Sequence, residues 1–194
     1  TINNGAAQKT KENYVLVMAG EPTASTGCTL TSNANSGNGY GIGIYRFALG
    51  NIDISTSHND GYYNNYTCSK WTLLELGKSY NVTIRTGTSN NEGAIVYIDY
   101  NDNGTFETGE AIVSFPANKE GTRTLSFTTP SSGVLLNKGL RLRVLSKFSL
   151  VPSTACDIGS YGQAEDYTVF FINNIVWTGT VSNDWNTSGN WSSN

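Results

Sequence analysis

The stretch from Asp99 to Glu110 carries the strongest chemical signal in the sequence. Oxygen-bearing side chains stand at its first, third and fifth positions, and Gly104 stands at the sixth, where the chain must turn sharply. A backbone carbonyl at position seven and a bidentate Glu at position 12 complete a set of hard oxygen ligands. This spacing is typical of a calcium loop. We therefore predict calcium as a cofactor, with the ligands Asp99, Asn101, Asn103, Thr105 and Glu110.

The segments beside this loop resemble strands rather than helices. Residues 93–98 combine β-branched and aromatic side chains without a helical period, and no helical pattern follows Glu110. The loop is therefore expected to join two β-strands, unlike an EF-hand. The alternative is a turn that binds no ion, because Asn, Asp and Gly favour turns in any case. The complete spacing favours calcium.

Composition limits the classes of partner. The chain has 194 residues, 14% of them charged, and a formal net charge of -3. This charge leaves no electrostatic footprint for a nucleic acid, so no nucleic-acid partner is expected. No apolar run approaches the roughly 20 residues of a membrane span, so we expect no membrane insertion. The start shows no signal-peptide pattern. We expect a secreted or cell-surface protein, monomeric here and part of a larger multidomain chain.

Catalytic and metal-binding arrangements other than the loop find little support. Cys28, Cys68 and Cys156 lack the CxxC spacing of zinc or redox sites, and one disulfide plus one free thiol is the simplest arrangement in a secreted protein. His58 is the only histidine. Neither a nucleophile–base pair nor facing carboxylates can be assembled, so we expect no enzyme activity.

Short segments with alternating apolar and polar residues recur along the chain, separated by turn signals. In the clearest of them, Tyr80, Val82 and Ile84 alternate with polar residues, as in a half-buried strand. With no helical period, this pattern predicts an all-β protein, an antiparallel β-sandwich of jelly-roll-like type. The expected strands are 40–49, 51–56, 71–76, 80–85, 93–98, 111–115, 122–128, 140–145 and 166–172, with a possible first strand at 14–19.

Four motifs resemble those of the GEVED domain, a module of large secreted proteins in Bacteroidota. Gly162–Val169 resembles the family signature, and Ile98–Glu110 resembles its Asp-rich segment. Gly139–Val144 is similar to its RLRV strand, and Gly61–Thr67 to its GYxDYT segment. The signature departs at Gln163, where the family often has Glu.

The resemblance implies a non-catalytic accessory beside proteases, glycoside hydrolases or adhesins. It also implies a Cys28–Cys156 disulfide, because the family often has cysteines at these places, with Cys68 as an addition. Residues 1–22 are then a linker or N-terminal tail with a possible first strand, and 23–174 are the GEVED-like sandwich. Residues 175–194, with three tryptophans, resemble the start of a following module.

Two adjacent carboxylates lie in the signature. Glu165 and Asp166 would point to opposite faces of a strand, which places them poorly as a general acid/base pair. One could complete a second cation site. We favour instead an ion pair with Arg141 or Arg143, because Arg–carboxylate forks are common across neighbouring strands.

Aromatic residues near turns are candidate sugar-binding residues, since the C–H faces of sugar rings stack on aromatic rings. The alternative is that they fill the core and keep a polar end at the surface, as Tyr and Trp often do. Lys147, with Arg46 and Arg123, would hold carboxylate or sulfate groups if the polysaccharide is acidic. The candidate ligand-binding residues are Tyr62, Tyr63, Trp71, Tyr161 and Lys147.

Two functions fit these features. The first is a calcium-stabilised carbohydrate-binding accessory module of a secreted polysaccharide-degrading enzyme, with an acidic or sulfated polysaccharide as one possible partner. The second is an adhesion, protein-interaction or spacer module of a secreted cell-surface protein.

Overall fold

The computed structural model describes residues 20–26, 28, 30, 40–173, 175–184 and 186–193. The possible strand at 14–19 lies outside these residues. Within the described part, no helix is both long and apolar enough to cross a membrane.

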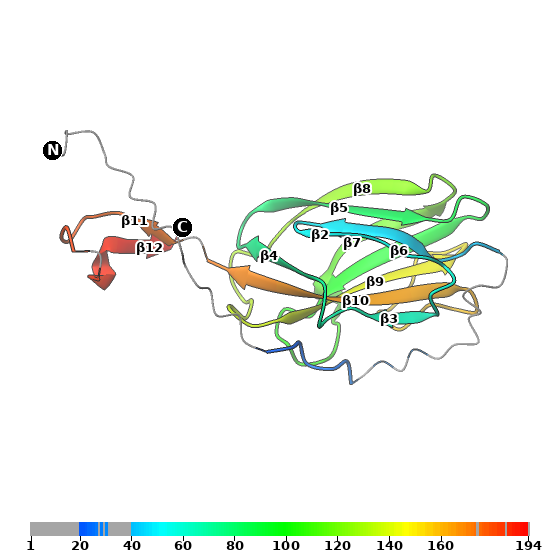
Figure 1. Cartoon of the computed structure of the whole chain (residues 1–194), viewed down its shortest axis with the longest axis horizontal. Coiled ribbons are helices and arrows are strands. Elements are labelled where there is room, and N and C mark those ends of the chain that lie inside the picture. Colours follow the sequence, from blue (N-terminus) through cyan, green and yellow to red (C-terminus); the bar gives the residue numbers. More distant parts are fainter. Residues whose placement is uncertain are drawn as a thin grey trace.

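Two β-sheets pack face to face, as Figure 1 shows. The smaller has the order β2-β1-β5-β8, with β1 Ile44–Leu49, β2 Ile52–Ser55, β5 Ser79–Thr86 and β8 Thr122–Thr128. The larger has the order β3-β10-β9-β6-β7, and β4 also pairs with β10. Its strands are β3 Tyr63–Asn65, β4 Trp71–Glu75, β6 Glu92–Ile98, β7 Ala111–Asn118, β9 Leu140–Phe148 and β10 Gly162–Ile172.

The prediction of an all-β sandwich is confirmed. Most neighbouring strands are antiparallel, but β3 and β4 pair in parallel with successive parts of β10. The sequence pattern does not predict β3, because its residues, Tyr63-Asn64-Asn65, are mostly turn formers. Its backbone pairing with Ala164, Glu165 and Asp166 overrides this weak local preference.

The core lies between the sheets and follows the alternation of the strands. Val96, Leu142 and Val169 of the larger sheet are fully buried, as are Phe47 and Ile84 of the smaller one. The opposite face of the larger sheet carries a second apolar cluster, which includes Ile95, Tyr97, Leu145 and Ala164. Both faces of this sheet are therefore covered, which explains why its central strands are buried along nearly their whole length.

Residues 20–26 form a segment that we call the N-terminal strap, shown in blue in Figure 1. It crosses the outer face of the larger sheet, where Arg141 Nε donates to the Thr23 carbonyl at 2.9 Å. At its start the Gly20 carbonyl lies against Gly139, where a Cβ would be only 2.6 Å from that oxygen. Beyond the strap, Cys28 is bonded to Cys156, which ties this part of the chain to the loop between β9 and β10.

The C-terminal residues form a small sheet of their own. Strand β11 (Ile175–Trp177) pairs antiparallel with β12 (Trp191–Ser193), and the rings of Trp177 and Trp191 are 5.1 Å apart. Between them, the buried Asn190 accepts from the backbone N–H groups of Val181 and Ser182, both at 2.8 Å. Trp185 lies outside the described residues.

Candidate functional site

The predicted calcium loop begins where β6 ends. Both side-chain oxygens of Asp99 accept backbone hydrogen bonds from the loop, from Asn103 N at 3.2 Å and Gly104 N at 2.8 Å. Gly104 has φ +80°, a left-handed conformation that favours glycine. Asn101 Oδ1 accepts from Asn103 N, and Asn103 Oδ1 accepts from Thr105 N. These contacts fold the oxygens at the first, third and fifth positions onto the loop's own backbone.

Glu110 closes the loop at the end of a short 3-10 turn, η1 (Thr108–Glu110). Its two carboxylate oxygens accept from Tyr100 N at 2.7 Å and Glu107 N at 3.0 Å. The side chain is nearly buried, and burial together with the nearby Glu107 carboxylate raises the pKa of Glu110 to about 7. A cation beside these two acids would favour the ionised form and reverse that shift.

The residue types of the loop suit calcium. Asp99 and Glu110 supply carboxylate oxygens, and Asn101, Asn103 and the Thr105 carbonyl supply neutral oxygens, which is the mixture that calcium accepts. An oxygen that accepts one hydrogen bond keeps a second lone pair for a ligand. In the described part of the chain, no group of three or more His, Cys, Asp or Glu side chains is arranged to hold a metal. A calcium ion in the loop would therefore need the amide and backbone oxygens in addition to the carboxylates of Asp99 and Glu110.

Asp102, at position four of the loop, has a role that the spacing does not predict. It adopts φ +53° and accepts from Thr23 N at 2.7 Å and from Thr23 Oγ1 at 2.8 Å. Its buried carboxylate also pairs with Lys138. Thr26 N donates to the Gly104 carbonyl at 3.0 Å. The loop and the N-terminal strap therefore hold each other in place.

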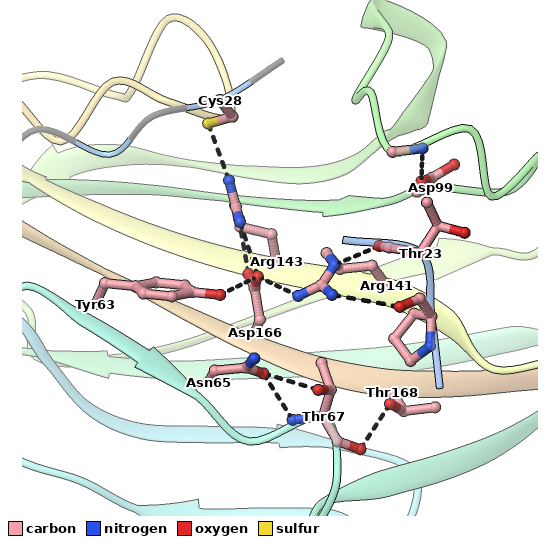
Figure 2. A network of polar contacts seen from close by, with 12 residues as sticks. Thr23, Cys28, Tyr63, Asn65, Thr67, Asp99, Arg141, Arg143, Asp166 and Thr168 are labelled. Carbon is pink, nitrogen blue, oxygen red and sulfur yellow. Dashed lines mark hydrogen bonds and ion pairs between the residues drawn. The ribbon is translucent and has the colours of Figure 1, made fainter. Parts of the chain in front are cut away.

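A buried ionic network lies under the strap, on the outer face of β9 and β10 (Figure 2). Arg143 donates to Asp166 through Nε and Nη2, both at 2.7 Å, and Arg141 Nη1 donates to the same carboxylate at 2.7 Å. The prediction of an Arg–Asp166 pair is confirmed for both arginines. Tyr63 Oη also donates to Asp166, at 2.8 Å. Burial, and to a lesser extent the charge of Asp166, raise the pKa of Tyr63 to about 12. The Arg143 guanidinium lies 5.0 Å from the Phe106 ring centroid, so the network contacts the calcium loop as well.

Glu165 and Gln163 face the opposite side of β10. Tyr167 Oη donates to Glu165 Oε2 at 2.6 Å, and burial raises the pKa of Glu165 to about 7. Gln163 Oε1 accepts from Ile44 N at 2.7 Å, while its Nε2 donates to the carbonyls of Ser57 and Gly61 at 3.0 and 2.8 Å. An amide can make this combination of contacts and a carboxylate cannot. The departure from the family signature at Gln163 therefore has a structural reason.

Three aromatic side chains meet where β9 ends and β10 begins. The Tyr161 ring centroid lies 5.4 Å from that of Tyr40 and 6.3 Å from that of Phe148, both in edge-on arrangements. Tyr40 is 55% exposed and Phe148 is 42% exposed. We call Tyr40, Phe148 and Tyr161 the aromatic end cluster. The sequence analysis identified only Tyr161, because the contact depends on the pairing of Phe148 N with the Tyr161 carbonyl, which no local pattern shows.

The other candidate ligand-binding residues do not join this cluster. Tyr62 is 36% exposed, and Tyr63 turns toward Asp166. Trp71 is 51% exposed and packs edge-on against Phe170. Trp71 pairs with Thr168 of β10. At the usual rise per residue of a β-strand, Thr168 lies about 20 Å along the strand from Tyr161. The structure therefore does not bring the predicted residues onto one surface.

Lys147 lies beside the aromatic end cluster, but its charge is already paired. Its Nζ is 2.7 Å from each carboxylate oxygen of Asp157, whose Oδ2 also accepts from Ser153 N and Oγ. These contacts fix Asp157 in the loop between β9 and β10. Lys147 therefore supports this loop.

Comparison with known protein families gives one result. Residues 93–170 match the model of the GEVED domain, from β6 to near the end of β10. Three of the four motifs described above lie entirely in this range: the Asp-rich segment, the RLRV-like strand and the signature. A search of curated proteins found no match. The match supports the resemblance of this chain to the GEVED family, and the calcium-loop candidate and the Asp166 carboxylate with its two arginines all lie in the matched part.

Proposed function

We propose that this domain is a non-catalytic module that binds polysaccharide, stabilised by calcium, as an accessory of a secreted polysaccharide-degrading enzyme. The observation that carries the proposal is the aromatic end cluster. Tyr40 and Phe148 keep about half of their surface exposed although they contact the Tyr161 ring. Rings held in this way offer a rigid apolar surface to the C–H faces of sugars and lose little side-chain entropy on binding.

The position of the cluster supports the proposal. Backbone hydrogen bonds from Phe148 N to the Tyr161 carbonyl and from Ser149 N to the Asn91 carbonyl fix the strand end that carries two of the rings. Asn90 Nδ2 donates to the Tyr40 carbonyl at 2.8 Å and holds the third. The cluster therefore lies on a rigid part of the sandwich, as a binding surface requires.

Removal of the exposed rings should abolish most of the binding. We expect Tyr40→Ala and Phe148→Ala each to weaken binding to a polysaccharide at least about tenfold, because a buried aromatic ring contributes about 1.5 kcal/mol or more. Affinity gel electrophoresis with plant and marine polysaccharides measures this effect. Trp71→Ala is the matched control, since Trp71 is as exposed as these rings but lies on β4.

Two results would contradict this assignment. If Trp71→Ala alone weakened binding, the binding surface would lie at the β4 edge. If the unaltered domain bound nothing in a broad panel, the alternative function of an adhesion, protein-interaction or spacer module would replace the carbohydrate proposal.

The calcium part of the proposal has its own test. We expect calcium to raise the free energy of unfolding by about 2.7 kcal/mol when free calcium exceeds the dissociation constant about 100-fold. Thermal unfolding in calcium and in EDTA measures the difference. The variants Asp99→Asn and Glu110→Gln should lose the response, whereas Asp53→Asn, an exposed acid on β2, should keep it. Identical unfolding curves in calcium and in EDTA would contradict a structural calcium ion.

A further inference from the structure

The charges around the aromatic end cluster indicate which class of polysaccharide it would accept. The sequence alone leaves an acidic or sulfated polymer open, to be held by Lys147, Arg46 and Arg123. Each of these cations can hold an anion only if its guanidinium or ammonium group is not already paired or buried.

None of the three is available. Lys147 is bound to both oxygens of Asp157. Arg46 forms a bidentate ion pair with Asp53 on the smaller sheet, with distances of 2.7 and 2.8 Å. Arg123 is only 8% exposed and donates to the Pro116 carbonyl and to Thr86 Oγ1. An anionic sugar would have to break an ion pair or enter the protein to reach any of these cations.

The acids nearest the cluster leave no positive charge beside it. Asp157 lies next to Lys147, so the pair has no net charge to offer. Glu92 lies opposite Phe148 in the pairing of β6 with β9, but it is fully buried and accepts from Gly43 N at 2.8 Å. Neither group offers a counter-charge to a carboxylate or sulfate on the ligand.

The polar groups next to the rings in the chain, or bonded to the same loops, are uncharged. The exposed Lys119 and Glu120, in the nearby loop between β7 and β8, are adjacent charges of opposite sign. Ser149 and Ser160 follow and precede two of the rings in the chain, and Asn90 and Asn91 contact the same loops through hydrogen bonds. Amides and hydroxyls both donate and accept, as the hydroxyl groups of a neutral sugar require. Apolar rings surrounded by a few neutral polar groups are the common composition of a small-ligand site.

From these contacts we infer that the polysaccharide bound at the aromatic end cluster is neutral, a polymer of hexoses or pentoses without carboxylate or sulfate groups. This inference rests on the proposed function. Two cations could oppose it. The Arg85 guanidinium lies over the Tyr45 ring, 5.6 Å from the centroid, and among the described residues it forms no ion pair. Lys119 is exposed in the loop between β7 and β8, next to Glu120.

The test compares two groups of soluble probes at two salt concentrations. Mixed-linkage β-glucan and arabinoxylan are the neutral probes, and carrageenan, alginate and polygalacturonate are the charged ones. The Debye length falls from about 10 Å at 0.1 M salt to about 3 Å at 1 M, so binding through a cation weakens with salt. We expect a neutral probe to bind with an affinity that changes less than about twofold over this range.

The variants separate the possible outcomes. Phe148→Ala should weaken binding of the neutral probe, and Arg85→Gln should leave it unchanged. Binding of the charged probes alone, weakened by salt and by Arg85→Gln, would overturn the inference of a neutral ligand and leave the carbohydrate proposal standing. Binding of no probe in either group would overturn the proposed function itself. Circular dichroism spectra of both variants should match that of the unaltered domain, which would show that a loss of binding does not result from unfolding.

Discussion

Asp166→Asn should lower the free energy of unfolding by about 3–5 kcal/mol, the cost of removing one partner from a buried ion pair. The carboxylate of Asp166 is fully buried and accepts from both Arg141 and Arg143, which are themselves 5% and 2% exposed. Its loss leaves two guanidinium groups under the strap without a counter-charge. Asn keeps the size of the side chain, so the effect reports the charge rather than a cavity. Urea unfolding followed by tryptophan fluorescence measures it.

The matched control is Asp53→Asn. Asp53 accepts two hydrogen bonds from Arg46 at similar distances, 2.7 and 2.8 Å, but this pair is exposed on the smaller sheet. Exposed pairs contribute about 0–1 kcal/mol. If both variants lost the same small amount, the Asp166 network would contribute no more than a surface pair, and this prediction would be wrong.

Gln163→Glu, which restores the residue that the family signature often has, should destabilise this chain by about 3 kcal/mol at neutral pH. The Gln163 amide donates to the carbonyls of Ser57 and Gly61, and an ionised carboxylate would face both oxygens without a proton to donate. Ile44 N would remain as a donor, so part of the cost is offset. Gln163→Leu, which removes the polar groups altogether, separates the loss of hydrogen bonds from the burial of a charge.

The stability of Gln163→Glu should also depend on pH. Burial against two carbonyl oxygens should raise the pKa of the introduced carboxyl above its value in the unfolded chain, near 4.3. The variant should then approach the stability of the unaltered domain below about pH 4 and lose stability as the pH rises. Urea unfolding at pH 4 and pH 8 tests this. A variant as stable as the unaltered domain at pH 8 would mean that the loop carrying Ser57 and Gly61 adapts to an acid.

The sandwich and the loop between its strands could be predicted because both follow local rules. Alternation along segments such as 80–85 shows which face is buried, since side chains on a strand have a period of two. The Asp166 pairing was also within reach, because Asp166 and the two arginines lie on strands expected to be neighbours. Strand β3 could not be predicted from the sequence, because only its pairing with β10 makes Tyr63-Asn64-Asn65 extended.

The aromatic end cluster could not be predicted for a different reason. Tyr40, Phe148 and Tyr161 lie far apart in the sequence, and no spacing rule connects them. They meet because the register of β9 with β10 places Phe148 beside Tyr161, and because the segment before β1 crosses the same end. The role of Asp102 likewise depends on the strap, a segment whose sequence has no strand pattern.

The anchoring of Gly20 against Gly139 has a consequence for where the two ends of the sandwich lie. Gly139 directly precedes β9, and the first residue of that strand pairs with Val169, close to where β10 leaves the sandwich at Ile172. The strap thus begins, and β10 ends, at the same end of the larger sheet (Figure 1), whereas Tyr161 directly precedes β10 at its other end. A module joined at either of these ends would therefore lie at the opposite end of the sandwich from the aromatic end cluster.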